Sequence, residues 1–190
     1  VVVEIVAFAD EVVIVRQVVQ HVDRDVKSVG ELHLLLGFRD VLDAIAKQNV
    51  ESIAICFLYS YVNPTHEQQV RDRIVERGLL EDWQVALSSD VLPEFREYER
   101  ASTVALEAYV RPVMGRYIGK LEAELHQRSP ETGLRVMKSD GGVINASRVQ
   151  QQAIQTALSG PAAGVIGAHH IAKLAGYTDI ITLDMGGTST

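Results

Sequence analysis

Apolar residues follow one another almost without interruption from Ile53 to Leu58, a run of strand length. A surface strand would alternate apolar and polar residues, so this run predicts a strand buried on both faces, as in the centre of a parallel sheet. Asn63-Pro64-Thr65 then ends the run and starts a helix that continues to Gly78. Gln84 to Ser88 predicts the next strand. This βαβ order predicts an α/β protein.

The first 27 residues are rich in valine and carry scattered acidic residues. They predict one or two strands, with Val12 to Val15 and Val18 to Val22 as candidates. Farther along, apolar residues return at helical spacing, which predicts a helix from Val41 to Lys47.

A long stretch with many alternating charges, Glu94 to Gln127, predicts helix. Pro112 lies inside it and has no backbone N–H to donate, so we expect two helices or one bent helix, with a domain junction at this point. Four aromatic side chains in this stretch are interpreted as packing anchors rather than as a stacking platform. They are Phe95, Tyr98, Tyr109 and Tyr117.

Shorter elements are predicted after the long helix. Leu134 to Lys138 predicts a strand, and Ala146 to Leu158 and Pro161 to Leu174 predict two helices. Ser159 is placed to cap the last of these helices, because serine at this position accepts a hydrogen bond from the first turn.

The last thirteen residues combine a predicted strand with a turn suited to phosphate. Ile180 to Leu183 is β-branched and apolar, which predicts a strand in the centre of a sheet. Asp184 follows, and a carboxylate at a strand end can hold Mg²⁺ directly or through water. The next turn can offer backbone N–H groups and hydroxyls to an anion. Its residues are Gly186, Gly187, Thr188, Ser189 and Thr190. An ordinary Gly-Gly hairpin turn is the alternative.

Two other turns are candidates for contact with a nucleotide. Gly141 and Gly142 follow the predicted strand 134–138 and repeat the strand-to-glycine pattern. Ser159 and Gly160 begin the last predicted helix, and a helix N-terminus attracts anions. Close packing of this glycine- and alanine-rich helix on a sheet is the alternative for the second turn.

Asn63, His66 and Glu67 follow the central strand, at the sheet edge where α/β proteins often bind ligands. A helix-cap arrangement is the alternative that we favour. His169 and His170 are adjacent and point in different directions, so no zinc site is predicted. No residue is assigned as a catalytic acid, base or nucleophile.

The net charge of −7 argues against binding to nucleic acid or to an anionic membrane surface. The one cysteine, Cys56, lies in the apolar run and is expected to be a buried thiol, which fits a reducing, cytoplasmic compartment. No stretch reaches the roughly 20 apolar residues of a membrane span. The start is unlike a secretory signal and has no initiator methionine, so we expect an internal piece of a longer protein.

Five segments, in this order, resemble the hydantoinase A/5-oxoprolinase family: ESIAICFLYSYVNPTHE, LSSDVLPEFREYERASTVALEAYVRPVMGRY, MKSDGGV, LSGPAAGVIGA and ITLDMGGTST. This family also includes the corresponding subunits of acetone and acetophenone carboxylases. The resemblance covers Glu51 to Thr190 and is specific, because five separate segments match in order. GFRDVLDAI, at 37–45, is similar to a family segment but lies closer to Glu51 than expected, and residues 1–36 have no assigned counterpart.

The resemblance implies an RNase H-like, actin-like ATPase fold of the sugar kinase and actin superfamily, whose two lobes close over a nucleotide and are incomplete here. It implies the end of an N-terminal lobe at 1–93 and the start of an ATPase lobe at 94–190. Asp184, Gly186, Gly187 and Thr188 match the second of two Asp-x-Gly-Gly-Thr turns, which bind phosphate and Mg²⁺. The first turn does not occur in this sequence, so we expect the piece to be inactive alone.

By this resemblance, the intact protein uses ATP and Mg²⁺ to phosphorylate the carbonyl oxygen of a cyclic amide, hydantoin or 5-oxoproline, for ring-opening hydrolysis. An ATP-dependent ketone carboxylase subunit, a non-catalytic scaffold that docks subunits and a regulatory actin-like ATPase are the alternatives. The family works with a hydantoinase B-like subunit or domain, so an oligomer is expected.

Overall fold

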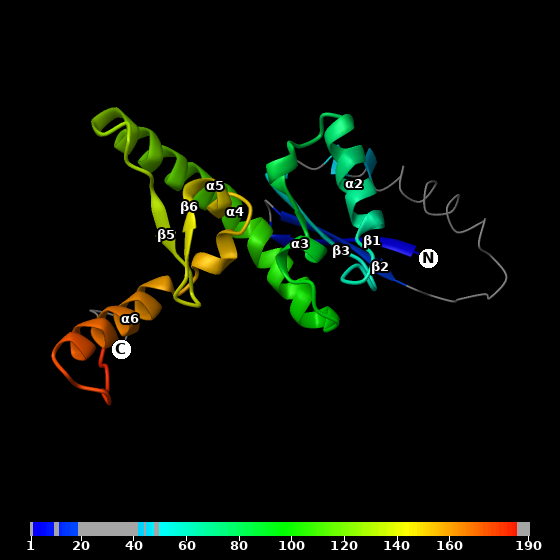
Figure 1. The fold of residues 1–190 in the computed structure, drawn as a ribbon. Coiled ribbons are helices and arrows are strands. Elements are labelled where there is room, and N and C mark those ends of the chain that lie inside the picture. Colours follow the sequence, from blue (N-terminus) through cyan, green and yellow to red (C-terminus); the bar gives the residue numbers. More distant parts are fainter. Residues whose placement is uncertain (1, 10–11, 19–41, 44, 48–49, 186–190) are drawn as a thin grey trace. The chain divides into compact units, whose positions relative to one another are not determined.

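The computed structural model describes residues 2–9, 12–18, 42–43, 45–47 and 50–185 of the chain (Figure 1). The chain forms two compact units, Val1–Val113 and Met114–Thr190. The boundary between them in the sequence falls one residue after Pro112. The helix α4 (Glu97–Arg128) contributes residues to both units. The predicted domain ranges, 1–93 and 94–190, remain a prediction.

The first unit is built on a four-stranded sheet. The strand order is β1 (Val2–Ala9), β2 (Val12–Val18), β3 (Ser52–Cys56) and β4 (Val85–Leu87). β1 and β2 are antiparallel, whereas β3 is parallel to both of its neighbours. All five residues of β3 are buried, which confirms the predicted central strand. The expectation of one or two strands near the start is confirmed, and the candidate Val12–Val15 lies in β2, whereas β1 was not among the named candidates. Of the candidate strand Val18–Val22, residues 19–22 lie outside the described residues.

Helices pack on both faces of β3, because successive side chains of a strand point to opposite faces. Ile53 and Ile55 share a core cluster with Val70 and Ile74 of α2 (Thr65–Glu76). The other face is lined by small side chains that let α4 approach closely. This cluster contains Ala54, Cys56, Ala86, Val104 and Ala108. The order β3, α2, β4 confirms the predicted βαβ unit, and Cys56 is a buried free thiol as predicted.

Leu42 and Ile45 also belong to the cluster on the α2 side of the sheet. They lie in a helical turn in which the N–H of Ala46 donates to the carbonyl of Leu42, at 2.9 Å. The predicted helix at 41–47 is therefore confirmed for the residues that the structure describes.

α4 continues through Pro112, so of the two expected outcomes, two helices or one bent helix, the first is wrong and a single helix is formed. Proline cannot donate to the carbonyl four residues earlier, which in this helix belongs to Ala108. Ser52 Oγ of β3 donates to that carbonyl at 2.6 Å, and this bond is buried. A side chain from the sheet therefore supplies the donor that Pro112 lacks, and the helix is maintained.

The aromatic side chains of the long stretch are not packing anchors, which corrects the sequence prediction. They are 49–82% exposed. These residues are Phe95, Tyr98, Tyr109 and Tyr117. Small residues such as Val104, Ala105 and Ala108 form the buried side of α4 instead. The sheet face opposite them carries alanines, so close approach excludes large rings from this contact.

The second unit contains a hairpin of β5 (Arg135–Met137) and β6 (Val143–Asn145). α5 (Ala146–Val149), the 3₁₀ helix η2 (Ala153–Thr156) and α6 (Ser159–Leu174) follow. The strand predicted at 134–138 is confirmed, whereas one helix over 146–158 is wrong. This segment breaks after Val149, and the carbonyl of Gln155 accepts the N–H of Ser139 from the hairpin tip at 2.7 Å. A tertiary hydrogen bond therefore prevails over helical composition.

α6 begins at Ser159, so the prediction that Ser159 caps the helix is wrong. The capping position belongs to Leu158, which has a left-handed φ of 57° and makes no side-chain hydrogen bond. Leu158 is 82% exposed, so the left-handed residue that precedes the helix lies in solvent.

The strand predicted at Ile180–Leu183 is not formed in the described residues up to 185. Ile181 and Leu183 are 99% and 79% exposed. A strand requires a hydrogen-bonded neighbour, and no described strand pairs with this segment. Sequence preference alone was therefore insufficient to form it.

None of the helices in the described ranges combines the length and apolar character that spanning a bilayer requires.

Candidate functional site

The tip of the β5–β6 hairpin contains the predicted nucleotide-contact residues Gly141 and Gly142. Gly141 N–H donates to the carbonyl of Lys138 at 3.1 Å, and Gly142 N–H donates to Asp140 Oδ1 at 2.8 Å. Gly141 has a φ of +83°, which favours glycine at this position. Both N–H groups therefore have partners within the turn, and an incoming phosphate would have to replace these acceptors.

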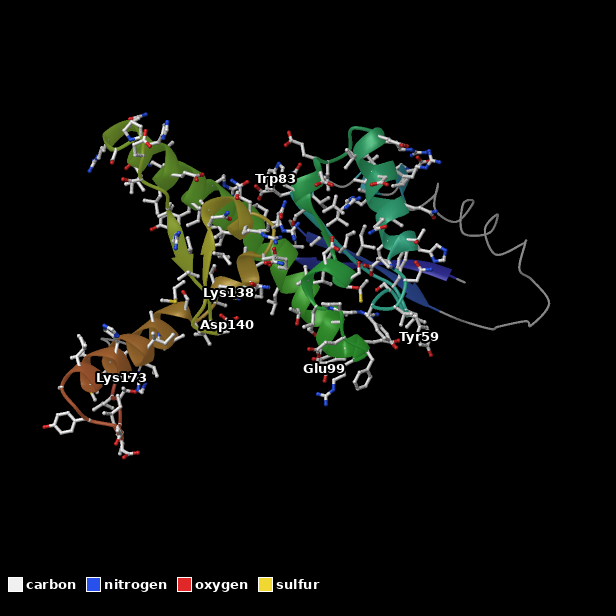
Figure 2. All side chains as sticks on the ribbon, in the orientation of Figure 1. Tyr59, Trp83, Glu99, Lys138, Asp140 and Lys173 are labelled. Atoms are coloured by element: carbon white, nitrogen blue, oxygen red, sulfur yellow. The ribbon has the colours of Figure 1, made fainter. Side chains whose placement is uncertain are left out.

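Asp140 and Lys138 stabilise this turn electrostatically. Lys138 Nζ donates to Asp140 Oδ2 at 2.6 Å, and the two side chains lie together at the hairpin tip (Figure 2). The hydrogen bond from Lys138, with that from the Gly142 N–H, holds the pKa of Asp140 below its ordinary value. The carboxylate is thus kept ionised, as an acceptor for the turn.

The hairpin tip packs on α6, which carries two more predicted contact residues. A side chain at Gly141 would collide with Ile166 of α6. Ser159 is half-buried and Gly160 is exposed in the first turn of this helix. N–H groups of a first turn have no partner within the helix, so they are suited to an anion. The structure thus brings Gly141 to α6, but against Ile166 in its middle rather than against its first turn.

Asp184, the predicted Mg²⁺ ligand, lies in the exposed irregular segment after α6. In the described part of the chain, no group of three or more His, Cys, Asp or Glu residues could hold a metal ion. Mg²⁺ usually keeps several waters and takes one or two carboxylates with substrate phosphates, so a single aspartate is compatible with it. The predicted phosphate residues Gly186, Gly187, Thr188 and Ser189 lie outside the described residues.

A second polar cluster lies where β3 and β4 end, and Glu67 is at its centre. Glu67 is fully buried. Its Oε1 accepts from the Phe57 N–H at 2.8 Å and from Ser88 Oγ at 2.6 Å, and its Oε2 accepts from the Ser89 N–H at 2.9 Å. One carboxylate therefore joins the end of β3, the start of α2 and the start of α3 (Ser88–Val91).

Arg100 holds the same strand end from the α4 side. Its side chain is fully buried, and Nη2 donates to the carbonyl of Phe57 at 2.5 Å. Nη1 donates to the carbonyl of Glu94 at 3.1 Å, and the guanidinium lies 5.3 Å from the centre of the Tyr61 ring. Among the described residues, Arg100 Nε and Ser89 Oγ are buried atoms with no hydrogen-bond partner. The cluster therefore retains one N–H donor and one hydroxyl that make no hydrogen bond within it.

Glu67 has a structural role, but the helix-cap arrangement that we favoured for Asn63, His66 and Glu67 is wrong, because the cap residue of α2 is Pro64 and it has no side-chain cap hydrogen bond. Asn63 Oδ1 accepts the N–H of Thr65 at 3.1 Å, where α2 begins. His66 is exposed, and Glu67 binds backbone and hydroxyl donors. The sequence indicated Glu67 from its position after the strand, but it missed Ser88, Ser89 and Arg100, which come from distant segments.

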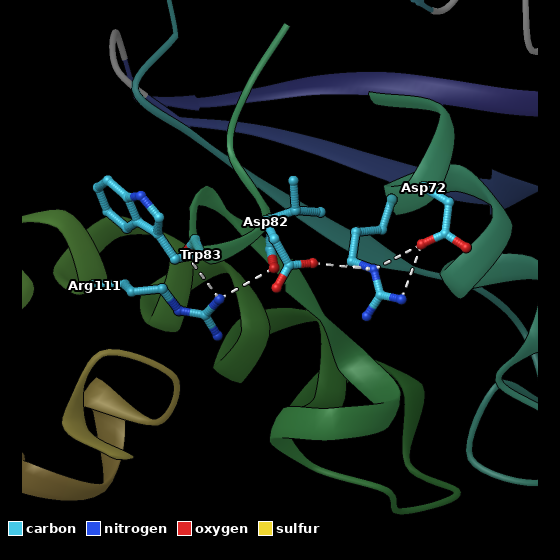
Figure 3. A network of polar contacts seen from close by, with 6 residues as sticks. Asp72, Asp82, Trp83 and Arg111 are labelled. Carbon is cyan, nitrogen blue, oxygen red and sulfur yellow. Dashed lines mark hydrogen bonds and ion pairs between the residues drawn. The ribbon is translucent and has the colours of Figure 1, made fainter. Parts of the chain in front are cut away.

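A third network connects α2 to the 3₁₀ helix η1 (Asp82–Gln84) and α4 (Figure 3). Arg71 Nε lies 3.3 Å from Asp82 Oδ1, and Arg111 Nη1 donates to the carbonyl of Trp83 at 3.2 Å. Arg111 also forms a buried pair with Glu107 at 2.8 Å. Nearby, burial raises the pKa of Asp90, although the charge of Arg71 opposes this shift. These contacts fix helices to the sheet rather than forming a metal or nucleophile site.

These features define an α/β protein whose candidate ligand contacts lie at strand ends and glycine turns. The family model described as hydantoinase/oxoprolinase N-terminal region matches residues 4–78, and that described as hydantoinase/oxoprolinase matches residues 100–190. The chain belongs to the hydantoinase/oxoprolinase family. The resemblance seen in the sequence is thereby confirmed.

Similar proteins have several named activities. Caprolactamase subunit alpha of Pseudomonas jessenii is 36% identical over 148 residues, which cover 78% of this chain and 21% of the relative. 5-Oxoprolinase of Saccharomyces cerevisiae is 35% identical over a match that covers 80% of this chain and 11% of the relative. The acetone carboxylase beta subunit of Xanthobacter autotrophicus is 33% identical over a match that covers 80% of this chain and 21% of the relative. The chain thus spans about a tenth to a fifth of these relatives' lengths.

Solved structures show the same relationship. The ATP-dependent caprolactamase from Pseudomonas jessenii matches with a TM-score of 0.70 and 32% identity, over 80% of this chain and 22% of that chain. Nucleotide-free acetone carboxylase matches with a TM-score of 0.60 and 30% identity, over 77% of this chain and 20% of that chain. Both are ATP-dependent enzymes by their titles, and their folds match the α/β arrangement described above.

Proposed function

We propose that this chain is part of an ATP-dependent enzyme that opens a cyclic amide by hydrolysis. The observation that carries the proposal is the similarity to caprolactamase in both sequence and structure, at 36% identity and a TM-score of 0.70. Caprolactam and 5-oxoproline are both cyclic amides, and the yeast 5-oxoprolinase is another relative. Hydantoin and 5-oxoproline are therefore members of the proposed substrate class.

The proposed fold is an incomplete RNase H-like, actin-like ATPase, with one lobe ending at residue 93 and another beginning at residue 94. The sheet with helices on both faces supports this proposal, as does the Asp-x-Gly-Gly-Thr pattern that begins at Asp184. In this proposal ATP transfers its γ-phosphoryl group to the amide oxygen and leaves as ADP. Water then adds to the activated carbon, the ring C–N bond breaks as the nitrogen is protonated, and a second water hydrolyses the resulting acyl phosphate to a carboxylate and phosphate.

Three groups of residues are proposed to bind the nucleotide and its Mg²⁺. Asp184 would hold Mg²⁺, and Gly186 to Ser189 would bind phosphate through N–H groups and hydroxyls. Ser159 and Gly160 would add N–H groups at the start of α6, and the solvent-exposed position of Gly160 fits this role. Gly141 and Gly142 would contribute after exchanging the acceptors within their turn. Charge neutralisation by such donors is what phosphoryl transfer requires.

The test uses the full-length protein with its partner subunits. We expect ATP hydrolysis to increase at least tenfold when caprolactam, hydantoin or 5-oxoproline is added, with one ring opened for each ATP consumed. Asp184→Asn should abolish this stimulated rate, whereas Asp179→Asn, a nearby exposed aspartate, should preserve it. Full Mg²⁺-dependent activity of the Asp184→Asn enzyme would refute the metal assignment.

Ketone carboxylation is the second candidate, and the acetone carboxylase relatives favour it. An enzyme of this kind would hydrolyse ATP in response to acetone or acetophenone with bicarbonate, and not in response to lactams. Stimulation by ketones alone would replace the cyclic amide proposal. ATP hydrolysis that responds to neither class would favour a regulatory ATPase, and its complete absence would favour a scaffold.

Partner subunits are part of the proposal. Three relatives are named as subunits, those of caprolactamase, acetone carboxylase and acetophenone carboxylase. We infer that the intact protein assembles with a second, hydantoinase B-like subunit or domain into an oligomer.

A further inference from the structure

Arg100 is a buried cation that has no carboxylate beside it. Its side chain is fully buried, and its two hydrogen bonds both go to backbone carbonyls. None of the ion pairs between described residues includes Arg100. Arg111, buried on the same helix, does have such a partner, because its Nε lies 2.8 Å from Glu107. Since burial of a charge without a counter-charge is costly, Arg100 differs from an arginine that only fixes the fold.

The guanidinium of Arg100 also has hydrogen-bond donors to spare. An arginine side chain carries five N–H groups in one plane, and the Nε–H of Arg100 has no partner. The carbonyl of Phe57 accepts both from Arg100 and from Ser60 Oγ, at 3.0 Å, so its lone pairs are used. The Glu67 carboxylate accepts its three hydrogen bonds from other residues. A group that completes this strand end would therefore be an acceptor with a negative charge.

Two tyrosine rings lead from Arg100 towards solvent. The half-buried Tyr61 ring is centred 5.3 Å from the guanidinium carbon, and the Tyr59 ring is centred 6.1 Å from that of Tyr61. Tyr59 is 68% exposed and has a left-handed φ of 58°, which is strained for a residue with a side chain. Strained backbone of this kind is concentrated at ligand sites. Rotation of the Tyr61 side chain away from the guanidinium would give a ligand access to Arg100.

We propose that the carboxyl end of β3 binds a small carboxylate, which replaces the Tyr61 ring and accepts hydrogen bonds from the Nε–H and a second N–H of Arg100. β3 is parallel to both of its neighbours, and α/β proteins often bind ligands beyond the carboxyl ends of parallel strands. The planar edge of a guanidinium matches the two oxygens of a carboxylate. Phosphate sites use several backbone N–H groups, and those of Phe57 and Ser89 are already bound to Glu67.

Saturation-transfer nuclear magnetic resonance tests this site in the full-length protein purified with its partner subunits. The probes are propanoate and propanamide, which have the same shape and differ in charge. We expect saturation transfer to propanoate at least ten times that to propanamide, and no displacement of propanoate by an equal concentration of phosphate. Absence of transfer to propanoate would overturn the proposal, as would equal transfer to the two probes, which would indicate an adventitious additive only. Displacement by phosphate would refute the assignment of a carboxylate.

Substitutions assign the binding to Arg100. Arg100→Lys keeps the charge but loses the planar pair of N–H groups, so it should weaken propanoate binding at least tenfold. Arg96→Lys, at an exposed arginine four residues earlier, should leave the binding within twofold. Circular dichroism and the melting temperature show whether each variant is folded. Unchanged binding by folded Arg100→Lys would refute the assignment.

Tyr61→Ala gives a readout that a purely structural arginine would not change. It removes the ring over the guanidinium, so we expect propanoate to bind at least three times more tightly. Unchanged or weaker binding by this variant would overturn the proposal, even if Arg100→Lys does not fold. The binding assays contain no ATP or cyclic amide, so they do not depend on the outcome of the hydrolysis assay.

Discussion

At the scale of single residues, Glu67 illustrates how one buried carboxylate organises the end of a sheet. It accepts three hydrogen bonds, from two backbone N–H groups and one serine hydroxyl. The sequence placed Glu67 at the correct strand end, because Asn-Pro-Thr marks the start of a helix. It could not predict Ser88 or Arg100, since these partners depend on how distant segments meet.

Replacing Glu67 with glutamine tests this organisation. The glutamine amide has one acceptor oxygen, so its NH₂ group would face a donor and leave buried N–H groups unpaired. We expect Glu67→Gln to reduce the free energy of unfolding by about 2–4 kcal/mol, measured by urea denaturation. Glu76→Gln, on the exposed side of the same helix, should change it by less than about 0.5 kcal/mol. Equal effects of the two substitutions would contradict the role of Glu67.

Asp140 gives the hairpin tip a defined pH dependence. Its pKa is lower in the folded chain than its ordinary value of 3.8, because Lys138 and the Gly142 N–H donate hydrogen bonds to the carboxylate. The stabilisation by Asp140 is therefore present above about pH 4 and is lost as the pH falls through the lower, folded pKa. Nuclear magnetic resonance should show the Gly142 amide losing its protection from exchange below pH 4. In Asp140→Ala, this amide should be unprotected throughout. An unchanged Gly142 amide on acidification would contradict this assignment.

At the scale of elements, the helix α4 shows why proline is a poor guide to a helix end. The sequence correctly predicted helix on both sides of Pro112, and it correctly identified the βαβ unit from uninterrupted apolar character. The continuity of α4 depends on Ser52, which is 56 residues from Ala108 in the sequence. Local patterns contain no information about such a donor. The sequence also missed β6, whose pairing is with β5, and the break after α5, in a segment where the carbonyl of Gln155 accepts the N–H of the distant Ser139.

A double-mutant cycle tests the compensation between Ser52 and Pro112. Ser52→Ala leaves the buried carbonyl of Ala108 without a donor, and we expect it to cost about 1–2 kcal/mol of unfolding free energy. Pro112→Ala restores the backbone N–H that this carbonyl would otherwise accept. In that background, Ser52→Ala should cost about 1 kcal/mol less, measured by denaturant unfolding. Additive effects of the two substitutions would refute the compensation.

At the scale of the whole molecule, the C-terminal part of the described chain exposes a large amount of apolar surface. α6 has no buried residue, and the segment after it leaves Ile181, Leu183 and Met185 exposed. The predicted site residues of this part stay predictions. A phosphate turn is a property of several neighbouring strands and loops, so the Asp-x-Gly-Gly-Thr pattern alone cannot place its members.

Exposed apolar surface of this size favours association of the isolated chain. Ile181→Lys with Leu183→Lys should lower its self-association at least fivefold in sedimentation velocity and reduce its binding of a hydrophobic dye. Thr182→Lys adds charge in the same segment without removing an apolar group, so most of the association should persist. A chain that stays monomeric and binds no dye would contradict the expectation.

The hydrogen bonds of Glu67 also have a consequence for the order of folding. They join residues 10 to 22 positions apart, and they close when β3, α2 and the end of β4 are all in place. We therefore expect these hydrogen bonds, which need three assembled segments, to form after the main barrier to folding. Glu67→Gln should therefore accelerate unfolding, by about 30-fold for each 2 kcal/mol lost, and leave the refolding rate nearly unchanged. The Glu67 carboxylate would then act as a latch that sets the lifetime of the folded sheet.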